Sequence, residues 1–332
     1  MTGALPPLVL TPGEPAGVGA EITLAAWLTG AVPAFCLLDD PDRVRRRAAR
    51  SGLTAGCVTI SHPAEAAAAF PHGVPVLPTE FAVDCAPGQP DPANAASVTG
   101  AIEDAVAAVR GGTALAVVTN PIQKHTLATA GFAHPGHTEF LAELAGGNRH
   151  PVMMLAGNGL RVVPATIHVP LARVPELISR SLVVKTARIV LEALRTDFGI
   201  DEPRLAVSGL NPHAGEGGVL GEEDSRVIGP AVAVLRAEGE QVSGPLPADS
   251  MFHAEARAGY DAALCMFHDQ ALIPVKTLDF WGAVNITLGL PFVRTSPDHG
   301  TALDLAGTGR ARPDSLVRAL QLAAAMGRRR RV

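Results

Sequence analysis

The sequence predicts an α/β protein in which short apolar strands alternate with longer helices. Runs rich in Val, Ile, Leu and Ala alternate along the chain with stretches of helical apolar spacing, which is typical of a sheet covered by helices. Of the 332 residues, 47% are apolar and 18% are charged, which excludes a disordered chain. At roughly 100–200 residues per domain, this length allows two domains.

The predicted strands are apolar runs that end in turn residues or polar clusters. In chain order they are 8–10, 34–38, 58–60, 114–118, 152–155, 162–167, 205–208, 262–267 and 284–287. Open α/β sheets bind ligands outside the carboxyl ends of their strands. We therefore expect the functional residues to lie where these strands end.

The predicted helices cover 20–28, 42–51, 97–110, 182–196, 225–238 and 315–326. Asp42 and Asp224 are predicted N-caps, and Gly111 and Gly239 lie where two of the helices are expected to end. The segment 84–94 contains three prolines and no periodicity, so it is the predicted linker.

Composition argues against several partners. The net charge is −5 and only 1 Tyr, 2 Trp and 10 Phe are present, which disfavours nucleic acid. The longest apolar run, 31–38, is too short for a membrane span, and no signal peptide is recognisable at the N-terminus. Four scattered cysteines favour a reducing compartment, and we expect a cytoplasmic protein. The four arginines at 328–331 are predicted to form a solvated, frayed end.

Three histidines follow three of the predicted strands. His168 follows VVPATI, His213 follows LAVSGLNP and His268 follows AALCMF. Imidazoles that meet at one sheet edge would form a facial set of ligands for a divalent metal, with Asp269 and Asp249 as carboxylates that orient them. The metal could be Zn, Mg, Co, Mn or Ni. The alternative is three unrelated surface or hydrogen-bonded histidines.

A second group of residues suggests an anion site. His137 and Thr138 precede a short helical stretch, with Thr138 as the predicted N-cap, and backbone N–H groups at a helix start favour phosphate or carboxylate. Lys276, Asn285 and Arg294 lie in the apolar stretch 271–294, where a charged group usually has a partner or an anionic ligand. A buried salt bridge is the alternative.

The glycine-rich segments do not match the common nucleotide motifs. No GxGxxG follows a strand and no GxxxxGK[ST] occurs, so both the Rossmann fingerprint and a P-loop are absent. Glycines instead cluster at 13–19, 215–218 and 298–307. By itself, a glycine-rich turn after the first strand is more often a tight βα connection than a binding site.

Six segments together resemble the 4-hydroxythreonine-4-phosphate dehydrogenase family of pyridoxal phosphate biosynthesis. They are TPGEPAGVG (11–19), PGHTEF (135–140), GLNPHAGEGG (209–218), GPLPADSMF (244–252), MFHDQ (266–270) and VNITLGLPFVRTSPDHGTALDLAGTG (284–309). The resemblance extends from residue 8 to about residue 325. HGTALDLAGTG is also similar to the adenosine-binding loop of isocitrate and isopropylmalate dehydrogenases, which implies two α/β/α domains that bind NAD without a Rossmann fingerprint.

The resemblance implies roles for particular residues. The implied metal ligands are His168, His213 and His268. The implied substrate contacts are His137, Thr138, Lys276, Asn285 and Arg294. The implied cofactor loop contains His299, Gly300, Thr301, Ala302, Asp304 and Gly307. Asp249 and Lys276 are both candidates for the general base.

The implied reaction is NAD(P)-dependent and metal-dependent oxidation of 4-phosphooxy-L-threonine. The product, 2-amino-3-oxo-4-phosphooxybutyrate, would lose CO₂ to give 3-amino-2-oxopropyl phosphate. The family also implies a homodimer whose site is shared between subunits. We expect a discontinuous cofactor domain of 1–125 with 295–332, and a metal-binding and dimerising domain of 126–294, with borders uncertain by ten residues or more.

Other functions remain open on the motifs alone. A related dehydrogenase could act on 4-phospho-D-threonate, 4-phospho-D-erythronate or an aromatic dihydrodiol carboxylate, because each offers a hydroxyl near a carboxylate. A zinc hydrolase would also use three histidines, but it would leave the loop 299–307 unexplained and would release no reduced nicotinamide. A non-catalytic phosphate-binding protein would need neither metal ligands nor that loop.

Overall fold

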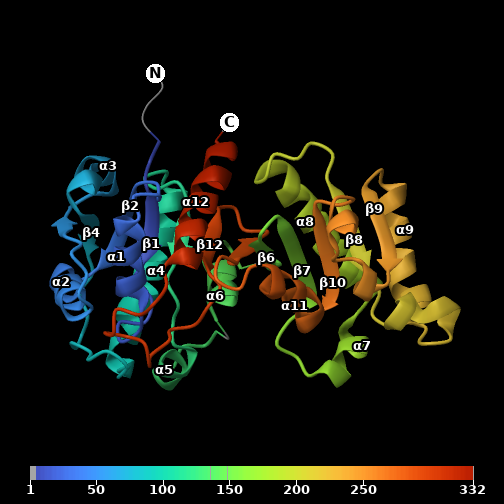
Figure 1. Ribbon diagram of the computed structural model, residues 1–332, viewed down its shortest axis with the longest axis horizontal. Helices are drawn as coiled ribbons and strands as arrows, with labels where there is room; N and C mark the ends of the chain where they lie inside the picture. The colour runs from blue at the N-terminus through green and yellow to red at the C-terminus, as the bar shows by residue number, and fades with distance from the viewer. Residues whose placement is uncertain (1–4, 135, 148, 332) are drawn as a thin grey trace. The chain divides into compact units, whose positions relative to one another are not determined.

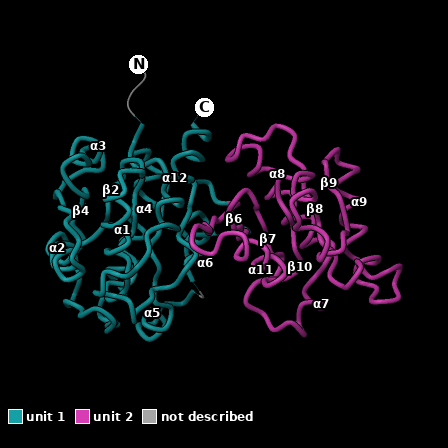
Figure 2. The backbone as a smooth tube through the Cα atoms, in the orientation of Figure 1, with its two compact units in different colours: residues 1–151, 290–332 teal, residues 152–289 magenta. Residues whose placement is uncertain are grey.

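The computed structural model describes residues 5–134, 136–147 and 149–331. The chain divides into two compact units, coloured separately in Figure 2. Unit 1 comprises 1–151 and 290–332, and unit 2 comprises 152–289. Within the described residues, no helix combines the length and apolar composition that crossing a membrane requires.

Unit 1 is built on a parallel sheet, seen in Figure 1. Its strand order is β3 (Cys57–Thr59), β4 (Val74–Pro78), β2 (Phe35–Asp39), β1 (Leu8–Thr11), β5 (Val117–Thr119) and β12 (Arg294–Pro297). Strands β1, β2, β5 and β12 are buried along their whole length, as expected for parallel strands with helices on both faces.

Helices cover both faces of that sheet. One face packs against α3 (Ala66–Ala69), α4 (Ala95–Arg110) and α6 (His137–Leu144). The other carries α1 (Gly19–Leu28), α2 (Pro41–Arg50) and α12 (Asp314–Arg329). On α12, Leu316, Ala319, Leu320 and Ala323 are buried, which is the stripe that helical periodicity places on one face.

Unit 2 has a mixed sheet. Its strand order is β11 (Val284–Leu288), β6 (Val152–Gly157), β7 (Leu160–Thr166), β10 (Ala262–Phe267), β8 (Arg204–Ser208) and β9 (Gln241–Leu246). Strands β7, β10, β8 and β9 run parallel, and β6 is antiparallel to its two neighbours. The turn from β6 to β7 uses Asn158 and Gly159 at φ 43° and 78°, which suits a tight hairpin.

Helix α11 (His268–Leu278) packs on one face of the unit 2 sheet through Ala271 and Val275. Helices α8 (Arg180–Thr196) and α9 (Gly229–Ala237) pack against each other and against the sheet. Shorter elements complete the described chain: η1 (Pro63–Glu65), η2 (Phe70–His72), η3 (Pro92–Asn94), α5 (Lys124–Thr129), η4 (Leu171–Arg173), α7 (Val174–Leu177), η5 (Pro212–Gly218), η6 (Asp224–Ile228), η7 (Ala248–Ser250) and α10 (Ala254–Arg257).

The predicted α/β class is confirmed, and each of the nine predicted strands is present within a few residues of its expected range. Strands β4, β9 and β12 and helix α11 were not predicted. Pro75 and Pro245 lie inside β4 and β9, Pro297 ends the polar strand β12, and Pro274 lies inside the helix. Because proline is unfavourable inside helices and central strands, the local sequence pattern does not indicate these elements.

The predicted N-cap of α2 and the predicted linker were both wrong. Asp40, rather than Asp42, caps α2, since its carboxylate accepts a hydrogen bond from the Asp42 N–H at 2.8 Å. The segment 84–94 is not a linker, because it lies inside unit 1. Its Asn94 is buried and exchanges hydrogen bonds of 3.0 Å with the backbone of Val83.

The expected domain division at 125/126 stays a prediction, which the two compact units do not test. Unit 2 begins at Val152, because Phe140 and Leu141 of α6 pack in unit 1 with Ala101 and Ile102 of α4. The functional roles assigned to the domains stay predictions.

Candidate active site

The three predicted strand-end histidines leave three adjacent parallel strands. Strand β10 pairs with β7 on one side and with β8 on the other, so the carboxyl ends of all three lie at one edge of the unit 2 sheet. His168 follows β7, His268 follows β10 and His213 follows β8. The sequence argument from matched strand ends therefore corresponds to true neighbours in the sheet.

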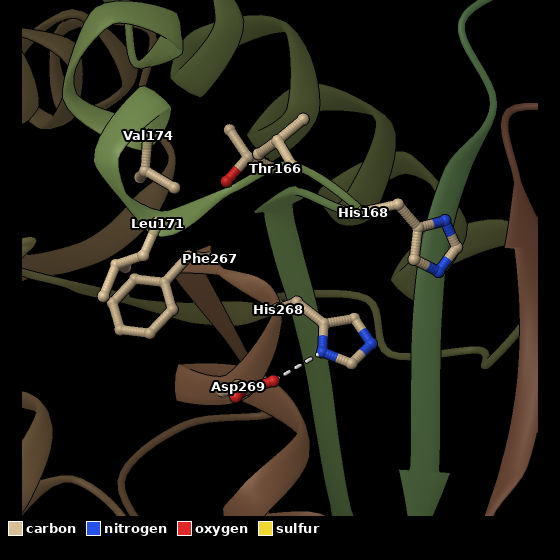
Figure 3. Close-up of a pocket in the computed structure, with 8 residues that line it drawn as sticks. Thr166, His168, Leu171, Val174, Phe267, His268 and Asp269 are labelled. Atoms are coloured by element: carbon tan, nitrogen blue, oxygen red, sulfur yellow. Dashed lines mark hydrogen bonds and ion pairs between the residues drawn. The ribbon is translucent and has the colours of Figure 1, made fainter.

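His168 and His268 are brought together. Their ring centroids lie 5.8 Å apart, and both line a cavity of about 250 Å³ whose other walls include Leu171, Val174 and Phe267, as Figure 3 shows. The Nδ1 atom of His268 is 2.7 Å from Oδ1 of Asp269. A carboxylate on Nδ1 orients the ring and leaves Nε2 as the atom that can bind a metal.

Side-chain hydrogen bonds hold the strand ends in place. The Thr166 hydroxyl donates to the Met266 carbonyl at 2.8 Å, which joins the ends of β7 and β10. Oε1 of Gln270 accepts hydrogen bonds from the Ser208 hydroxyl and the Met266 N–H, at 2.8 and 2.7 Å, and its amide donates to the Gly209 carbonyl at 2.8 Å. Gln270, which the sequence analysis did not single out, therefore ties β10 to β8.

The loop that carries His213 has an unusual backbone. Residues 213–217 all have positive φ, and among them His213, Ala214 and Glu216 lie at 52°, 51° and 42°. Each such non-glycine residue costs on the order of 1–3 kcal/mol and persists only where the surroundings enforce it. His168 has φ 52° as well, so two of the three predicted metal ligands occupy this strained region.

Asp224 enforces that loop. It is 1% exposed, and its carboxylate accepts hydrogen bonds from the N–H groups of Leu210 and Asn211 at 2.8 and 3.1 Å. The prediction that Asp224 caps a helix was wrong, because its oxygens bind the loop before the helix. A Cβ at Gly209 would lie 2.7 Å from Oδ1 of Asp224, so glycine permits this close approach.

Among the described residues, no group of three or more His, Cys, Asp or Glu side chains is close enough to hold a metal ion. The structure thus pairs His168 with His268 and leaves His213 at the end of the adjacent strand. The donor chemistry suits a divalent metal, since three imidazoles border one sheet edge and one of them already has its carboxylate partner.

The other predicted residues of unit 2 are dispersed. Asp249 is exposed on η7, which follows β9, the strand next to β8. Asn285 is half-buried on β11. Lys276 lies in the last turn of α11, with Nζ 5.3 Å from the ring centroid of Phe280. At 1.5 Å per residue, its backbone is about 12 Å along that helix from His268.

A basic cluster of Lys124, His137 and Arg294 lies in unit 1. Arg294 is 3% exposed and donates a hydrogen bond of 2.6 Å to the Thr119 hydroxyl at the end of β5. Burial lowers the pKa of Arg294 to about 10. A guanidinium held in such surroundings forms strong charge-assisted hydrogen bonds with an anion.

His137 is the first residue of α6. Gly136 is the N-cap, so the prediction that Thr138 caps this helix was wrong. Nε2 of His137 is buried and has no hydrogen-bond partner among the described residues. Burial, and after it the charges of Arg294 and Lys124, hold the pKa of His137 well below its usual range, so the imidazole is neutral.

Lys124 was missed by the sequence analysis, although it follows the polar end of β5 in the segment NPIQK. A Cβ at Gly136 would lie 3.2 Å from Cε of Lys124, so glycine permits this close approach. The end of β5, the start of α5 and the start of α6 thus bring together two cations, Arg294 and Lys124, and the neutral ring of His137.

The predicted cofactor loop packs against the glycine-rich segment 13–19. The Thr301 carbonyl accepts a hydrogen bond of 3.1 Å from the Val18 N–H, and a Cβ at Gly17 would lie 3.0 Å from that carbonyl. The Gly307 N–H donates to the carboxylate of Glu21. Asp304, His299 and Gly300 are exposed on the same loop.

A buried ion pair stabilises the glycine-rich segment on which this loop packs. Arg47 is 2.9 Å from Glu21 and donates to the carbonyls of Gly17 and Pro15 at 2.8 and 3.0 Å. Arg43 pairs with Asp39 and also donates to the Pro15 carbonyl. The two glycine-rich segments therefore form one cross-linked structure in unit 1.

The chain is similar to characterised families along nearly its whole length. Residues 32–323 match the family described as pyridoxal phosphate biosynthetic protein PdxA. The 4-hydroxythreonine-4-phosphate dehydrogenase of Methylorubrum extorquens (strain PA1) is 57% identical over 326 residues, covering 96% of this chain and 93% of that protein.

Solved structures extend the similarity to the fold. The crystal structure of 4-hydroxythreonine-4-phosphate dehydrogenase from Klebsiella pneumoniae matches with a TM-score of 0.87 and 34% identity, covering 97% of this chain and 99% of that one. A terephthalate 1,2-cis-dihydrodiol dehydrogenase from Burkholderia xenovorans LB400 matches with a TM-score of 0.65 and 28% identity, covering 97% and 98% of the two chains.

Proposed function

This chain belongs to the 4-hydroxythreonine-4-phosphate dehydrogenase (PdxA) family, and we propose that it oxidises 4-phosphooxy-L-threonine with NAD(P) and a divalent metal. The oxidised carbon is C3, and the product is 2-amino-3-oxo-4-phosphooxybutyrate. That product is a β-keto acid, and its loss of CO₂ gives 3-amino-2-oxopropyl phosphate. Two electrons and the C3 hydrogen leave as hydride, and the hydroxyl proton leaves to a base.

The observation that carries the proposal is the histidine edge of unit 2. His168, His213 and His268 end three adjacent parallel strands, and Asp269 orients the ring of His268. These three imidazoles would hold the metal. When bound, the metal would supply Lewis-acid polarisation of the substrate hydroxyl, and the nicotinamide would accept the hydride.

The basic cluster of unit 1 would bind the substrate phosphate. Arg294 is fixed by Thr119, and the neutral His137 offers a buried ring nitrogen, Nε2, with no protein partner among the described residues. A phosphate oxygen would satisfy that nitrogen and would neutralise the charge of Arg294. Thr138 and the backbone at the start of α6 would contribute further donors.

The hydroxyl proton needs an acceptor, and two groups remain candidates. Asp249 is an exposed carboxylate that follows the strand adjacent to β8. Lys276 would have to act in its neutral form. Asn285 would position the substrate by hydrogen bonding.

We also propose a homodimer in which Lys276 serves the histidines of the partner subunit. Lys276 lies about 12 Å along α11 from His268 of its own chain, by the rise of 1.5 Å per residue. Large apolar side chains of unit 2 are exposed, with Val219 at 81%, Phe280 at 61% and Trp281 at 54%. Such surfaces favour burial against a second copy.

The loop 299–307 would hold the adenosine half of the cofactor. Its cross-links to Val18 and Glu21 supply the rigid backbone that such a site needs. Asp304→Ala should raise the KM for NAD about tenfold while leaving the KM for the phosphorylated substrate unchanged. His137→Ala should do the reverse. Equal effects of both substitutions on both constants would reject this division.

A cytoplasmic location is part of the proposal. The four cysteines are all free. Free thiols and a nicotinamide cofactor both suit a reducing compartment.

A second candidate substrate is an aromatic dihydrodiol carboxylate, because the Burkholderia xenovorans dehydrogenase shares the fold at 28% identity. The deciding assay follows reduced nicotinamide with 4-phosphooxy-L-threonine, 4-phospho-D-threonate, 4-phospho-D-erythronate and a dihydrodiol carboxylate, each with and without chelator. We expect the first to give the highest kcat/KM and chelator to abolish turnover. Turnover that chelator leaves unchanged, or a preference for the non-phosphorylated diol, would overturn the proposal.

A further inference from the structure

A second cationic site lies in unit 1, away from the basic cluster. The lining of a cavity of about 360 Å³ there includes Arg110, Leu115, Arg149, Phe292, Arg330 and Arg331. Leu115 precedes β5 and Val293 precedes β12, so the cavity lies at the amino ends of these parallel strands. Thr119, which binds Arg294, marks their carboxyl ends.

Three of the four arginines that line this cavity donate hydrogen bonds to backbone carbonyls. Arg110 donates to the Leu144 carbonyl at 2.9 Å, Arg330 to the Leu290 carbonyl at 3.0 Å and Arg331 to the Gly112 carbonyl at 3.1 Å. The prediction that 328–331 is frayed was wrong, because α12 continues to Arg329 and the next two arginines are hydrogen-bonded. The prediction that this end is solvated is confirmed for Arg328, Arg329 and Arg331, which are exposed.

The charges at this cavity do not balance within its walls. Four arginines line it, and none of the described residues that line it is acidic. Helices α4, α6 and α12 end nearby, at Arg110, Leu144 and Arg329. Each helix C-terminus is equivalent to roughly half a negative charge, so three of them offset about half of the positive charge that Arg110, Arg149 and Arg331 bring. The helix C-termini therefore balance only part of the positive charge of these arginines.

The remaining walls are apolar. Val109, Leu115, Pro291 and Phe292 face the same cavity as the guanidinium groups. Arginine presents a planar fork that matches phosphate oxygens, and a cavity of this volume lies in the range of small-molecule sites. An anion with an apolar or planar portion would satisfy both parts of the lining.

We propose that this cavity binds a small phosphate ester through Arg110, Arg149, Arg330 and Arg331, with its organic portion against Phe292 and Leu115. The site is distinct from the basic cluster of Lys124, His137 and Arg294 and does not depend on the proposed reaction. Helix α6 contributes to both, since its first residue is His137 and the residue after its last turn, Ala145, lines the cavity.

The test uses phenyl phosphate as the probe and inorganic phosphate as the second arm. In the unsubstituted full-length chain, phenyl phosphate should slow amide hydrogen exchange in 109–115 and 327–331. Calorimetry should show that R110M/R331M weakens this binding event about tenfold or more, because charge-assisted hydrogen bonds to two guanidinium groups are lost. The substrate KM measured on the same variant should be unchanged.

The matched control is R45M/R46M, which removes the same charge from exposed positions of unit 1 where the side chains are 51% and 53% exposed. It should bind phenyl phosphate like the unsubstituted chain. Absence of protection in both segments of the unsubstituted chain would overturn the site, whether or not R110M/R331M folds. If R110M/R331M and R45M/R46M weaken phenyl phosphate binding equally, the effect comes from net charge alone and the site is overturned. Equal affinity for inorganic phosphate would overturn the assignment to an ester.

Discussion

The carboxyl edges of the two sheets present nitrogen donors in opposite surroundings. In unit 2 the histidines stay accessible, with the His268 side chain 36% exposed beside a cavity of about 250 Å³. In unit 1 Arg294 is 3% exposed, and the ring nitrogen Nε2 of His137 is buried. The unit 2 histidines follow adjacent parallel strands, whereas the unit 1 cluster joins the starts of α5 and α6 to the first residue of β12.

The difference follows from what each edge would bind. A metal needs neutral imidazoles with open positions for substrate, and it needs no dry pocket. A phosphate gains most from cations that have already been desolvated, because hydrogen bonds to ions strengthen as the local dielectric constant falls. The predictions below test this contrast, from the largest expected effect to the smallest.

The largest effect should come from His268→Ala. Loss of a metal ligand removes charge stabilisation of several kcal/mol, so kcat/KM should fall by about 10³-fold or more. Asp269→Asn is the matched control, because it removes only the orienting carboxylate and should lower metal affinity by about 10–100-fold. Steady-state kinetics at saturating metal separate the two. If Asp269→Asn lowers kcat/KM at saturating metal as much as His268→Ala does, the assignment of Asp269 as an orienting carboxylate is contradicted.

Arg294→Met should have the next largest effect. It removes a buried guanidinium from the basic cluster, and kcat/KM for the phosphorylated substrate should fall about 10²-fold with the KM for NAD unchanged. Thr119→Val should cost about tenfold, because the hydroxyl only positions that guanidinium. A large change in the KM for NAD in Arg294→Met would contradict a substrate role.

Mixing two inactive chains tests whether one active site uses residues from both subunits. His213→Ala and Lys276→Ala should each be inactive alone. If one site takes its histidine and its lysine from different chains, random exchange makes half the dimers mixed with one intact site each, and about a quarter of full activity returns. No recovery in this pairing or in His168→Ala with Lys276→Ala, with subunit exchange verified, would reject the shared site.

The smallest effect is the pH dependence of stability from His137. Its folded-state pKa lies below 6.5, so the unfolded chain binds the extra proton as pH falls through that value. Stability contributed by the neutral ring is thus complete above about pH 6.5 and is lost below it, by at most about 1.4 kcal/mol per pH unit. The free energy of unfolding, measured with denaturant between pH 5 and 7.5, should depend less steeply on pH in His137→Asn than in the unsubstituted chain. Identical slopes would place the ring in water.

The candidate metal site was recognisable from the sequence because each histidine lies within five residues of the end of an apolar strand. Their adjacency required only that 162–167, 205–208 and 262–267 lie side by side in one parallel sheet. Residues that act through tertiary contacts were not recognisable in the same way. Gln270 binds Ser208 from 62 positions away, and Asp224 resembles a helix cap until its oxygens are seen to hold Leu210 and Asn211.

The basic cluster was recognised only in part. His137 and Arg294 were predicted from their local setting, but Lys124 lies in a polar stretch that looks like any solvated loop. Its electrostatic effect on His137 depends on how the starts of α5 and α6 meet in space. Likewise, the arginines at 330 and 331 bind carbonyls at positions 290 and 112, contacts that no local pattern encodes.

Cobalt titration of the metal-free protein tests the histidine edge most directly. The account predicts that the chain binds one Co²⁺ with visible absorption typical of nitrogen ligands. The separate substitutions His168→Ala, His213→Ala and His268→Ala should each abolish that absorption or weaken binding by 10²-fold or more, whereas Asp304→Ala should leave it unchanged. A triple-alanine variant that still binds one Co²⁺ with the same spectrum and affinity would contradict the account.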